Sequence, residues 1–361
     1  MLLPNITLGS LTRLLRRWVR RVGGLANWAL NKAPSQGMPG SHESKLLIIY
    51  DLSSQPFSVG DILIVQEASL VLRESHKLKK IDFAVVYDPS KPVVADPAFS
   101  YIDPESFLFH LSSILQAAQV NPYLGSFFLF DSHSSLESYV ADNKSNYQVW
   151  PSLGLYASRE YLFYHCFNEL FYEFYEANRK LPNLGSRPAA KSWVFEFLRA
   201  HAQSPVVGTV QLRRNLNNPR RNSNYDAWLG FFRYCADHYP VKFVVICAPA
   251  EIDPKLRDLP NVVIAKDHYT SLELDLALIE AADFHMGASS GPSTIAQFNG
   301  KPYCVFGWKI DPAVFKDITH DRHRYRFYFS TPFQNWIAEE ENTELLIKEF
   351  QNIWKEVQAE S

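Results

Sequence analysis

The chain has 361 residues, 47% of them hydrophobic and 20% charged, which is the composition of a globular protein long enough for two domains. A formal net charge of −2 provides no general attraction to nucleic acid, and no run of about 18 apolar residues predicts a transmembrane helix. The four cysteines lack the Cys-x-x-Cys spacing of zinc and redox sites, so we expect buried free thiols and a reducing, cytoplasmic location.

Residues 1–44 predict a basic amphipathic helix followed by a linker. Between residues 11 and 30, apolar residues recur at helical spacing and arginines fill the other positions, whereas residues 1–31 contain no acid. The arginines interrupt any signal-peptide core. The pattern therefore favours either a helix on an anionic membrane surface, on the inner face of the membrane, or a helix that packs on protein. Residues 32–44 are rich in Pro, Gly and polar residues and are typical of a linker.

The first globular region, residues 45–185, alternates apolar strands with helices. The expected strands are 45–51, 81–88 and 126–131, and the expected helices are 61–77 and 103–118. This alternation predicts a parallel sheet and a Rossmann-like domain. The three strands end in Asp51, Asp88 and Asp131, whose carboxylates would gather at one edge of the sheet. They either anchor loops and cap helices, or one of them, with Asp51 as the candidate, contacts an acceptor or serves as a general base.

Two features lie before the second region. Residues 156–178 are unusually aromatic at helical spacing, which indicates either core packing or a platform for a sugar. Leu181–Arg187 contains Pro and Gly and is the expected hinge.

The second region, residues 186–336, repeats the alternation and predicts another Rossmann-like domain. The expected strands are 206–212, 242–247, 261–265, 284–286 and 303–306, and the expected helices are 188–202, 225–239 and 271–281. Residues 337–361 predict a terminal helix that returns to the first domain. The predicted fold class is thus α/β, with two Rossmann-like domains facing a cleft.

An anion site is predicted at the carboxyl ends of two strands of the second region. Arg213 and Arg214 follow the strand that ends at Leu212, and arginine can grip phosphate with two hydrogen bonds. Ser289, Ser290 and Gly291 form a small-residue turn before an expected helix, whose first N–H groups point outward. Ligands of open α/β sheets bind at this edge, so the pattern favours a pocket for a diphosphate.

Further charged residues follow the same strands. Arg220 and Arg221 lie in a polar loop after Arg213, and Arg324 lies in the basic run 321–326. These three could contact the acceptor or close over the donor, or they could lie in solvated loops. The acids that follow the neighbouring strands or begin the next helix are candidate donor contacts: Glu251, Asp267 and Asp275.

The order of these motifs resembles the donor half of the GT-B fucosyltransferases, namely the α1,6- and nodulation-type enzymes, the protein O-fucosyltransferases and bacterial relatives. The resemblance covers residues 206–306 and rests on the arginine-bearing strand, the acid after the next strand, and D-L-A-L-I-E-A-A-D-F followed by Ser-Ser. It implies that Arg213 is catalytic and grips the β-phosphate, that Ser289 and Ser290 hold phosphate oxygens, and that Glu251 or Asp275 contacts the base or ribose. Gln211 stands where the family usually has His, and Leu216 where an acid is common.

The sequence thus favours a metal-independent glycosyltransferase that uses a nucleotide-sugar donor, with a GDP-sugar favoured, and a glycan or lipid-linked acceptor. The chain has neither Asp-x-Asp nor a His-x-x-x-His pair on one helix, so we expect no metal and no cofactor. Without a metal, arginines and helix N-termini must stabilise the leaving group. Two alternatives remain: a pyruvyl- or phospho-transferase on the same fold, and a non-catalytic protein that binds nucleotide or glycan at a membrane surface.

Overall fold

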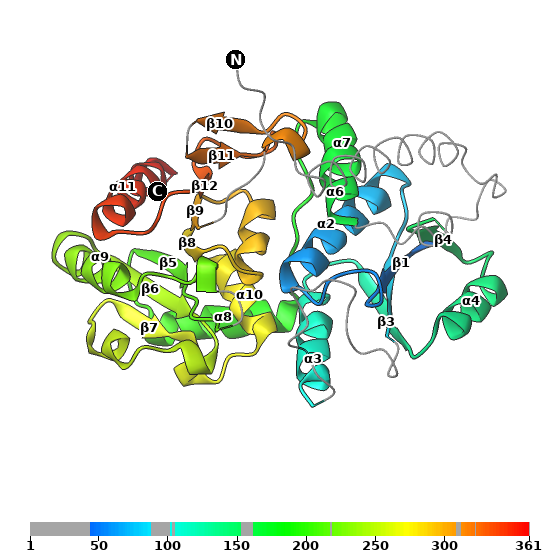
Figure 1. Ribbon diagram of the computed structural model, residues 1–361, viewed down its shortest axis with the longest axis horizontal. Coiled ribbons are helices and arrows are strands. Elements are labelled where there is room, and N and C mark those ends of the chain that lie inside the picture. The colour runs from blue at the N-terminus through cyan, green and yellow to red at the C-terminus, as the bar shows by residue number, and fades with distance from the viewer. Residues whose placement is uncertain are drawn as a thin grey trace, which may run out of the picture.

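The computed structural model describes residues 44–87, 102, 105–152, 162–216, 219–307, 312–321 and 323–360. These residues form two α/β domains side by side, each built on a largely parallel sheet (Figure 1). The basic segment at residues 11–30, its linker, Asp88 and the expected helix cap Asp103 lie outside the described residues.

The first sheet has the strand order β3-β2-β1-β4, and all of its pairs are parallel. Its strands are β1 (Lys45–Asp51), β2 (Ile81–Val86), β3 (Leu124–Phe130) and β4 (Tyr147–Trp150). Helices α2 (Val59–Ser75) and α3 (Phe107–Ala117) share the larger core with one face of the sheet, and α4 (His133–Asp142) packs on the other. The predicted parallel sheet is confirmed, whereas the sequence analysis missed α4 and β4.

The second sheet has the order β10-β11-β12-β9-β8-β5-β6-β7. Six of its strands are parallel: β5 (Val206–Gln211), β6 (Val241–Ile246), β7 (Val262–Ile264), β8 (Phe284–Ala288), β9 (Tyr303–Phe306) and β12 (Gln334–Ile337). Two short antiparallel strands, β10 (Thr319–Asp321) and β11 (Arg324–Arg326), extend one edge. Helices α8 (Pro188–His201) and α10 (Leu272–Ala281) share the core cluster of one face, and α9 (Tyr225–His238) lies on the other.

The C-terminal helix α11 (Thr343–Glu360) corrects one prediction. The sequence analysis expected it to return to the first domain, but it packs against α9 and the second sheet (Figure 1). Its buried residues Leu346, Phe350 and Ile353 belong to the same apolar cluster as Phe243 and Phe284 of that sheet. The helix is therefore part of the apolar core on this face of the second sheet.

The aromatic stretch, rather than α11, packs the first domain against the second. It consists of α6 (Leu162–His165), the π-helix η2 (Cys166–Leu170) and α7 (Phe171–Asn178). The ring of Phe167 lies 4.7 Å from that of Phe327 and 6.4 Å from that of Phe298, so these aromatics are core residues that bridge the domains. The expected hinge at Leu181–Arg187 follows and is held to α10, where the Ser186 N–H donates to Glu280 at 2.7 Å.

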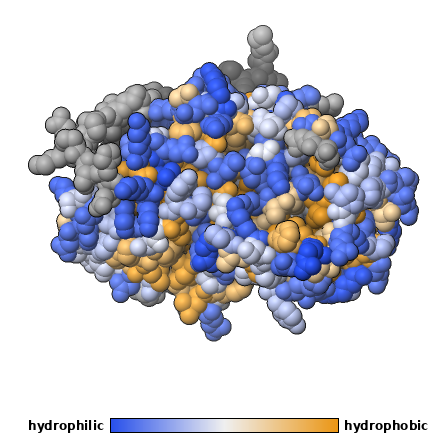
Figure 2. All heavy atoms as spheres, turned by 180° about the vertical axis from the view of Figure 1, so that it is seen from behind, coloured by the Kyte–Doolittle hydropathy of each residue, from blue (hydrophilic) through white to orange (hydrophobic). Residues whose placement is uncertain are grey.

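The face opposite that of Figure 1 is largely polar (Figure 2). Seen from behind, apolar side chains gather mainly in its lower part (Figure 2). Leu108 and Phe109 of α3 are 71% and 70% exposed. No helix in the described part of the chain is both long and apolar enough to cross a membrane.

Helix α2 is buried on nearly every side, because it lies between the first sheet and the second domain. Its Glu67 is fully buried, and neither carboxyl oxygen has a hydrogen-bond partner. Burial, with a smaller contribution from Glu74, raises the pKa of Glu67 well above its ordinary value. The carboxyl group thus stays protonated in the folded protein at pH values where it ionises in the unfolded chain.

We expect Glu67→Gln to increase the free energy of unfolding at pH 7 by about 1–3 kcal/mol. A pKa that is raised in the folded state lowers stability only at pH values above the pKa of the unfolded chain. The stability gained by Glu67→Gln should therefore shrink toward pH 4. Urea denaturation at both pH values measures it, with Glu137→Gln at an exposed position of α4 as control. An equal gain at pH 4 and pH 7 would contradict the explanation.

Candidate functional site

Strands β5 and β8 bring Arg213 and Ser289 to the same wall of the second domain. In the parallel register Gln211 pairs with Gly287, so each of the two residues lies two positions beyond a paired residue. Gly287 permits this close pairing, because its φ is +142° and a Cβ there would lie 2.3 Å from the Gln211 carbonyl oxygen. The pairing of β5 with β8 thus brings the end of the arginine-bearing strand beside the Ser-Ser-Gly turn.

Arg221 lies at the centre of the site, although its sequence context predicted only an acceptor or lid role. Its guanidinium donates three hydrogen bonds to Ser289: Nε and Nη2 to the carbonyl oxygen at 2.9 and 2.5 Å, and Nη2 to Oγ at 2.9 Å. The loop that carries it folds back on the end of β5, where the Ser223 hydroxyl accepts from the Arg213 N–H at 3.1 Å. Arg221 thereby fixes the turn, and Arg213 lies beside it.

The N-terminus of α2, from the first domain, meets the same turn. A Cβ on Gly291 would lie 2.7 Å from the Cβ of Val59 and 3.0 Å from the Gly60 nitrogen. Ser58 caps the helix by accepting from the Asp61 N–H at 3.4 Å. Gly291 is therefore required for close approach of the two domains, rather than of a ligand alone. The N-terminus of the 17-residue helix α2 adds its partial positive charge to the charges of Arg213 and Arg221.

The charges around Arg221 explain its electrostatics. Burial lowers the pKa of Arg221 to about 10, the neighbouring Arg213 guanidinium adds to the decrease, and the Asp61 carboxylate opposes it. Two guanidinium groups are thus held close together in a half-buried position, and an anion between them would relieve their repulsion. Asp61 is the acid that the first domain contributes to this centre.

The two serines differ in what they can offer a ligand. Ser289 is 2% exposed, its N–H donates to the Phe306 carbonyl oxygen at 2.9 Å, and its hydroxyl already accepts from Arg221. Ser290 is 8% exposed, and no described group hydrogen-bonds its hydroxyl. Ser290 is consequently the better candidate to donate to a phosphate oxygen.

One element of the predicted turn is different. The sequence analysis expected an α-helix to start after Gly291, but residues Pro292–Phe298 form a short 3-10 helix. The long helix that points its N-terminus at the turn is α2 of the other domain. Both domains therefore contribute to the candidate anion site, which no pattern within residues 206–306 could indicate.

Arg214 points away from this centre, as the alternation of side chains along a strand predicts. Its guanidinium lies 4.0 Å from the centroid of the Tyr225 ring and 3.3 Å from the Asp253 carboxylate. Both contacts belong to the loops and helix beyond β5 and β6, so Arg214 is engaged in local packing.

The three acids that were candidate donor contacts are likewise engaged by protein groups. Glu251 accepts from the Ala248 N–H at 3.1 Å and closes its own turn, and Asp267 makes a two-point ion pair with Arg257 at 2.8 and 2.6 Å. Asp275 is 3% exposed and accepts from Lys266 and Thr270, each at 2.6 Å. Burial raises the pKa of Asp275 to about 6, and the Lys266 ammonium and Thr270 hydroxyl limit this increase.

In the first domain, Asp51 lies at the end of β1 and is 3% exposed. Its carboxylate accepts from the Ser53 N–H at 2.8 Å and is paired with His133 at 2.7 Å. Asp131 accepts from the Ser135 hydroxyl at 3.2 Å in the first turn of α4. Both contacts are those of loop and helix anchors. Sequence reasoning missed His133, because it lies in a helix that was not predicted.

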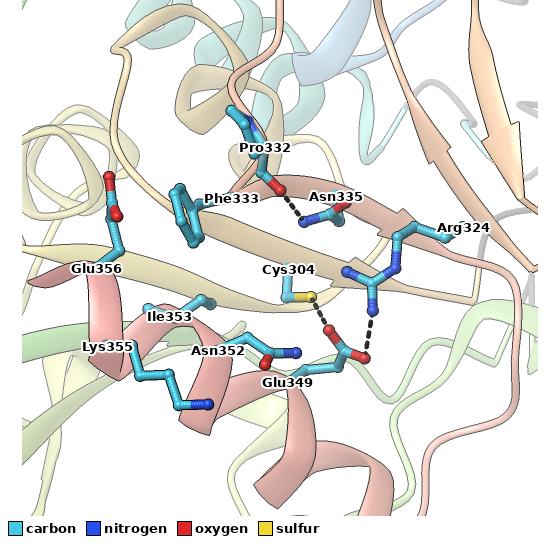
Figure 3. A pocket seen from close by; sticks show the side chains of 10 residues that line it. All are labelled: Cys304, Arg324, Pro332, Phe333, Asn335, Glu349, Asn352, Ile353, Lys355 and Glu356. Atoms are coloured by element: carbon cyan, nitrogen blue, oxygen red, sulfur yellow. Dashed lines mark hydrogen bonds and ion pairs between the residues drawn. The ribbon is translucent and has the colours of Figure 1, made fainter.

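The two remaining arginines make no described contact with Ser289 or Ser290. Arg220 is exposed in the short 3-10 helix Pro219–Arg221. Arg324 lies in β11, where its guanidinium pairs at 2.6 Å with Glu349 of α11, at a cavity of about 320 Å³ (Figure 3). The run 321–326 thus belongs to an edge hairpin. Arg324, which was expected as a possible lid over the donor, forms an ion pair with α11 in this structure.

In the described part of the chain, no group of three or more His, Cys, Asp or Glu side chains is placed to hold a metal ion. The site that the structure assembles consists of Arg213, Arg221, Ser290, Asp61 and the first turn of α2. Asp61 was missed because its signal, an acid in the first turn of a helix, is common in helices that bind nothing.

Neither a protein-family model nor a curated protein sequence matches the chain. Solved structures do. A glycosyl transferase family 9 protein from Veillonella parvula is similar with a TM-score of 0.55 at 11% identity, over 88% of this chain and 99% of that one. The ADP-heptose LPS heptosyltransferase II of E. coli gives 0.51 at 13% identity, over 88% and 100%. At these identities the likeness concerns the fold, which is the two-domain GT-B arrangement.

Proposed function

We propose that the protein is a glycosyltransferase that transfers a sugar from a nucleoside-diphosphate donor to a hydroxyl group of an acceptor. The observation that carries this proposal is the convergence of Arg213, Arg221, the Ser-Ser-Gly turn and the N-terminus of α2 between two Rossmann-like domains. Each of these groups favours an anion, and several such groups around one place suit a diphosphate, which offers more oxygen atoms than a single carboxylate.

The arrangement supplies what the transfer requires. The acceptor oxygen attacks the anomeric carbon while the bond from that carbon to the diphosphate oxygen breaks, so negative charge develops on the β-phosphate. Fixed guanidinium groups stabilise that charge in the transition state. Asp61 lies at the edge of the same centre, on the first domain, where it can accept the proton of the acceptor hydroxyl.

The donor and acceptor belong to the proposal as well. The likeness to the fucosyltransferase donor half supports a GDP-sugar, and the name of the E. coli neighbour supports an ADP-sugar. A glycan or lipid-linked acceptor would bind in the first domain.

Titration calorimetry with ADP, GDP, UDP and CMP, followed by a donor-hydrolysis assay with the matching nucleotide sugars, tests the function. We expect at least one of the three nucleoside diphosphates ADP, GDP and UDP to bind. We also expect Asp61→Asn to lower turnover by about 10²-fold or more while the diphosphate affinity stays within a few-fold of wild type. Absence of binding by all four nucleotides would refute the proposal.

One observation favours a second candidate, nucleotide binding without catalysis. Gln211 stands where the resembling family has His. Its side chain is 5% exposed and donates to the Leu212 carbonyl oxygen at 2.9 Å, and its amide cannot take up or release a proton as an imidazole can. Tight diphosphate binding without turnover for any donor, in the presence of glycan acceptors, would favour this candidate.

The basic segment at residues 11–30 carries a separate proposal, attachment to an anionic membrane surface. We expect the chain to sediment with vesicles that contain phosphatidylserine or cardiolipin, and a chain lacking residues 1–40 to stay in the supernatant with its fold intact. Equal sedimentation of both chains would contradict an anchoring role.

A further inference from the structure

His285 is the second residue of β8 and is 1% exposed, yet both of its ring nitrogens have partners. Nδ1 lies 3.0 Å from the Thr209 hydroxyl of β5, and Nε2 lies 3.0 Å from the Ser293 hydroxyl. Burial lowers the pKa of His285 to about 3, so the imidazole is neutral at physiological pH.

The direction of these hydrogen bonds can be assigned. The Ser293 hydroxyl donates to the Ala288 carbonyl oxygen at 3.1 Å, so its oxygen must accept from His285. A neutral imidazole donates through only one nitrogen. The Thr209 hydroxyl also lies 3.4 Å from the Phe284 carbonyl oxygen, but the Ser293–Ala288 bond is shorter, so we place the imidazole proton on Nε2 and let Nδ1 accept from Thr209. The result is one continuous chain from Thr209 through His285 and Ser293 to Ala288.

This series of hydrogen bonds ends at the turn for which we propose phosphate binding. Ala288 immediately precedes Ser289, and the Ser293 N–H also donates to the Ser290 carbonyl oxygen at 3.2 Å. Ser293 thus closes the turn from within, while Arg221 holds it from outside through Ser289. The other end of the chain, Thr209, belongs to the strand that delivers Arg213.

We propose that His285 is a positioning residue, which through Ser293 holds the Ala288–Gly291 turn in the conformation that binds a donor diphosphate and ties it to the arginine-bearing strand. The inference rests on the proposed function of the same site. A neutral imidazole suits this role because one rigid ring both accepts and donates a hydrogen bond, whereas a hydrocarbon of similar size would leave Thr209 and Ser293 without these partners.

The test compares binding of nucleoside diphosphates and monophosphates by titration calorimetry, using whichever of ADP, GDP or UDP the wild type binds. We expect Ser293→Ala to weaken diphosphate binding about tenfold, which corresponds to the loss of about one hydrogen bond. Monophosphate binding should stay within about twofold of wild type. Thr209→Val, which breaks the far end of the chain, should weaken diphosphate binding less. His285→Gln, which can still donate to Ser293, should retain more affinity than His285→Leu.

Asn261→Ala is the matched control. Asn261 is also buried in the second domain, at 5% exposure, and donates to the Phe232 carbonyl oxygen at 2.9 Å, far along the chain from the turn. It should lower the melting temperature without changing the ratio of the two affinities. If Ser293→Ala behaves like this control, with lower stability and wild-type diphosphate affinity, the network is structural only and the inference is overturned. If the wild type binds no diphosphate, the proposed function itself fails, and the inference with it.

Discussion

Replacing Arg213 with alanine is expected to lower the turnover of the donor by about 10²–10³-fold, the usual effect of removing one preorganised donor of hydrogen bonds to a developing charge. Arg213 follows directly from buried β5, so its backbone is held rigidly beside the turn. Arg213→Lys should recover little activity, because an ammonium cannot reproduce the two-point fork of a guanidinium. Single-turnover kinetics with the nucleotide sugar measure the effect.

Arg221→Ala should be at least as damaging, and it should also weaken nucleotide binding, because Arg221 holds Ser289 in place with three hydrogen bonds. Two neighbours serve as controls. Arg220→Ala should change little, since Arg220 is exposed, and Arg214→Ala should cost mainly stability through its contacts with Tyr225 and Asp253. Circular dichroism must show that each variant is folded. Near-normal turnover in both Arg213→Ala and Arg221→Ala would refute the proposed site.

The second large effect is expected at Gly208, in the centre of β5. A Cβ at this position would lie 2.1 Å from Cζ of Phe284, whose ring is fully buried between β5 and α11. Alanine in a strand is normally more stable than glycine by about 0.5–1 kcal/mol, so the sign of the change depends on this clash. We expect Gly208→Ala to lower the free energy of unfolding by about 3 kcal/mol, as for overpacked cores. Guanidinium denaturation provides the measurement.

A second substitution tests the cause. Phe284→Leu removes the ring that meets the new methyl group, so the double variant should be more stable than the sum of the two single effects predicts. Gly185→Ala is the control, because the nearest atoms to its Cβ would be 3.7 Å away. Additive effects of Gly208→Ala and Phe284→Leu would contradict the proposed contact.

The apolar runs and their alternation with helices were sufficient to predict both parallel sheets. Runs such as Lys45–Asp51 and Val206–Gln211 are buried on both faces, which makes their sequence signal strong. The same reasoning placed Arg213 near Ser289, because both follow adjacent parallel strands. It failed for α4 and β4, whose residues are mixed in polarity since one side of each is exposed.

The position of α11 and the roles of Asp61, Arg221 and His285 could not be read from local patterns. Each depends on contacts between segments far apart in the chain, as when Val59 and Gly60 of α2 meet Gly291. Conversely, Glu251 and Asp267 follow strands and Asp275 begins a helix, as ligand-binding acids do, but intramolecular partners satisfy all three. A side chain's neighbours in space decided its role, and those neighbours are set by tertiary packing.

All four cysteines, Cys166, Cys235, Cys247 and Cys304, are buried, and burial raises the pKa of each thiol. The wild-type chain therefore presents almost no thiolate to a maleimide reagent at neutral pH. A cysteine introduced at Leu108 of the first domain and another at Phe195 of the second, which are 71% and 66% exposed, can carry a fluorophore pair without removing any native thiol. Energy transfer between the two dyes would then report directly on how far the domains move apart or together when a nucleotide enters.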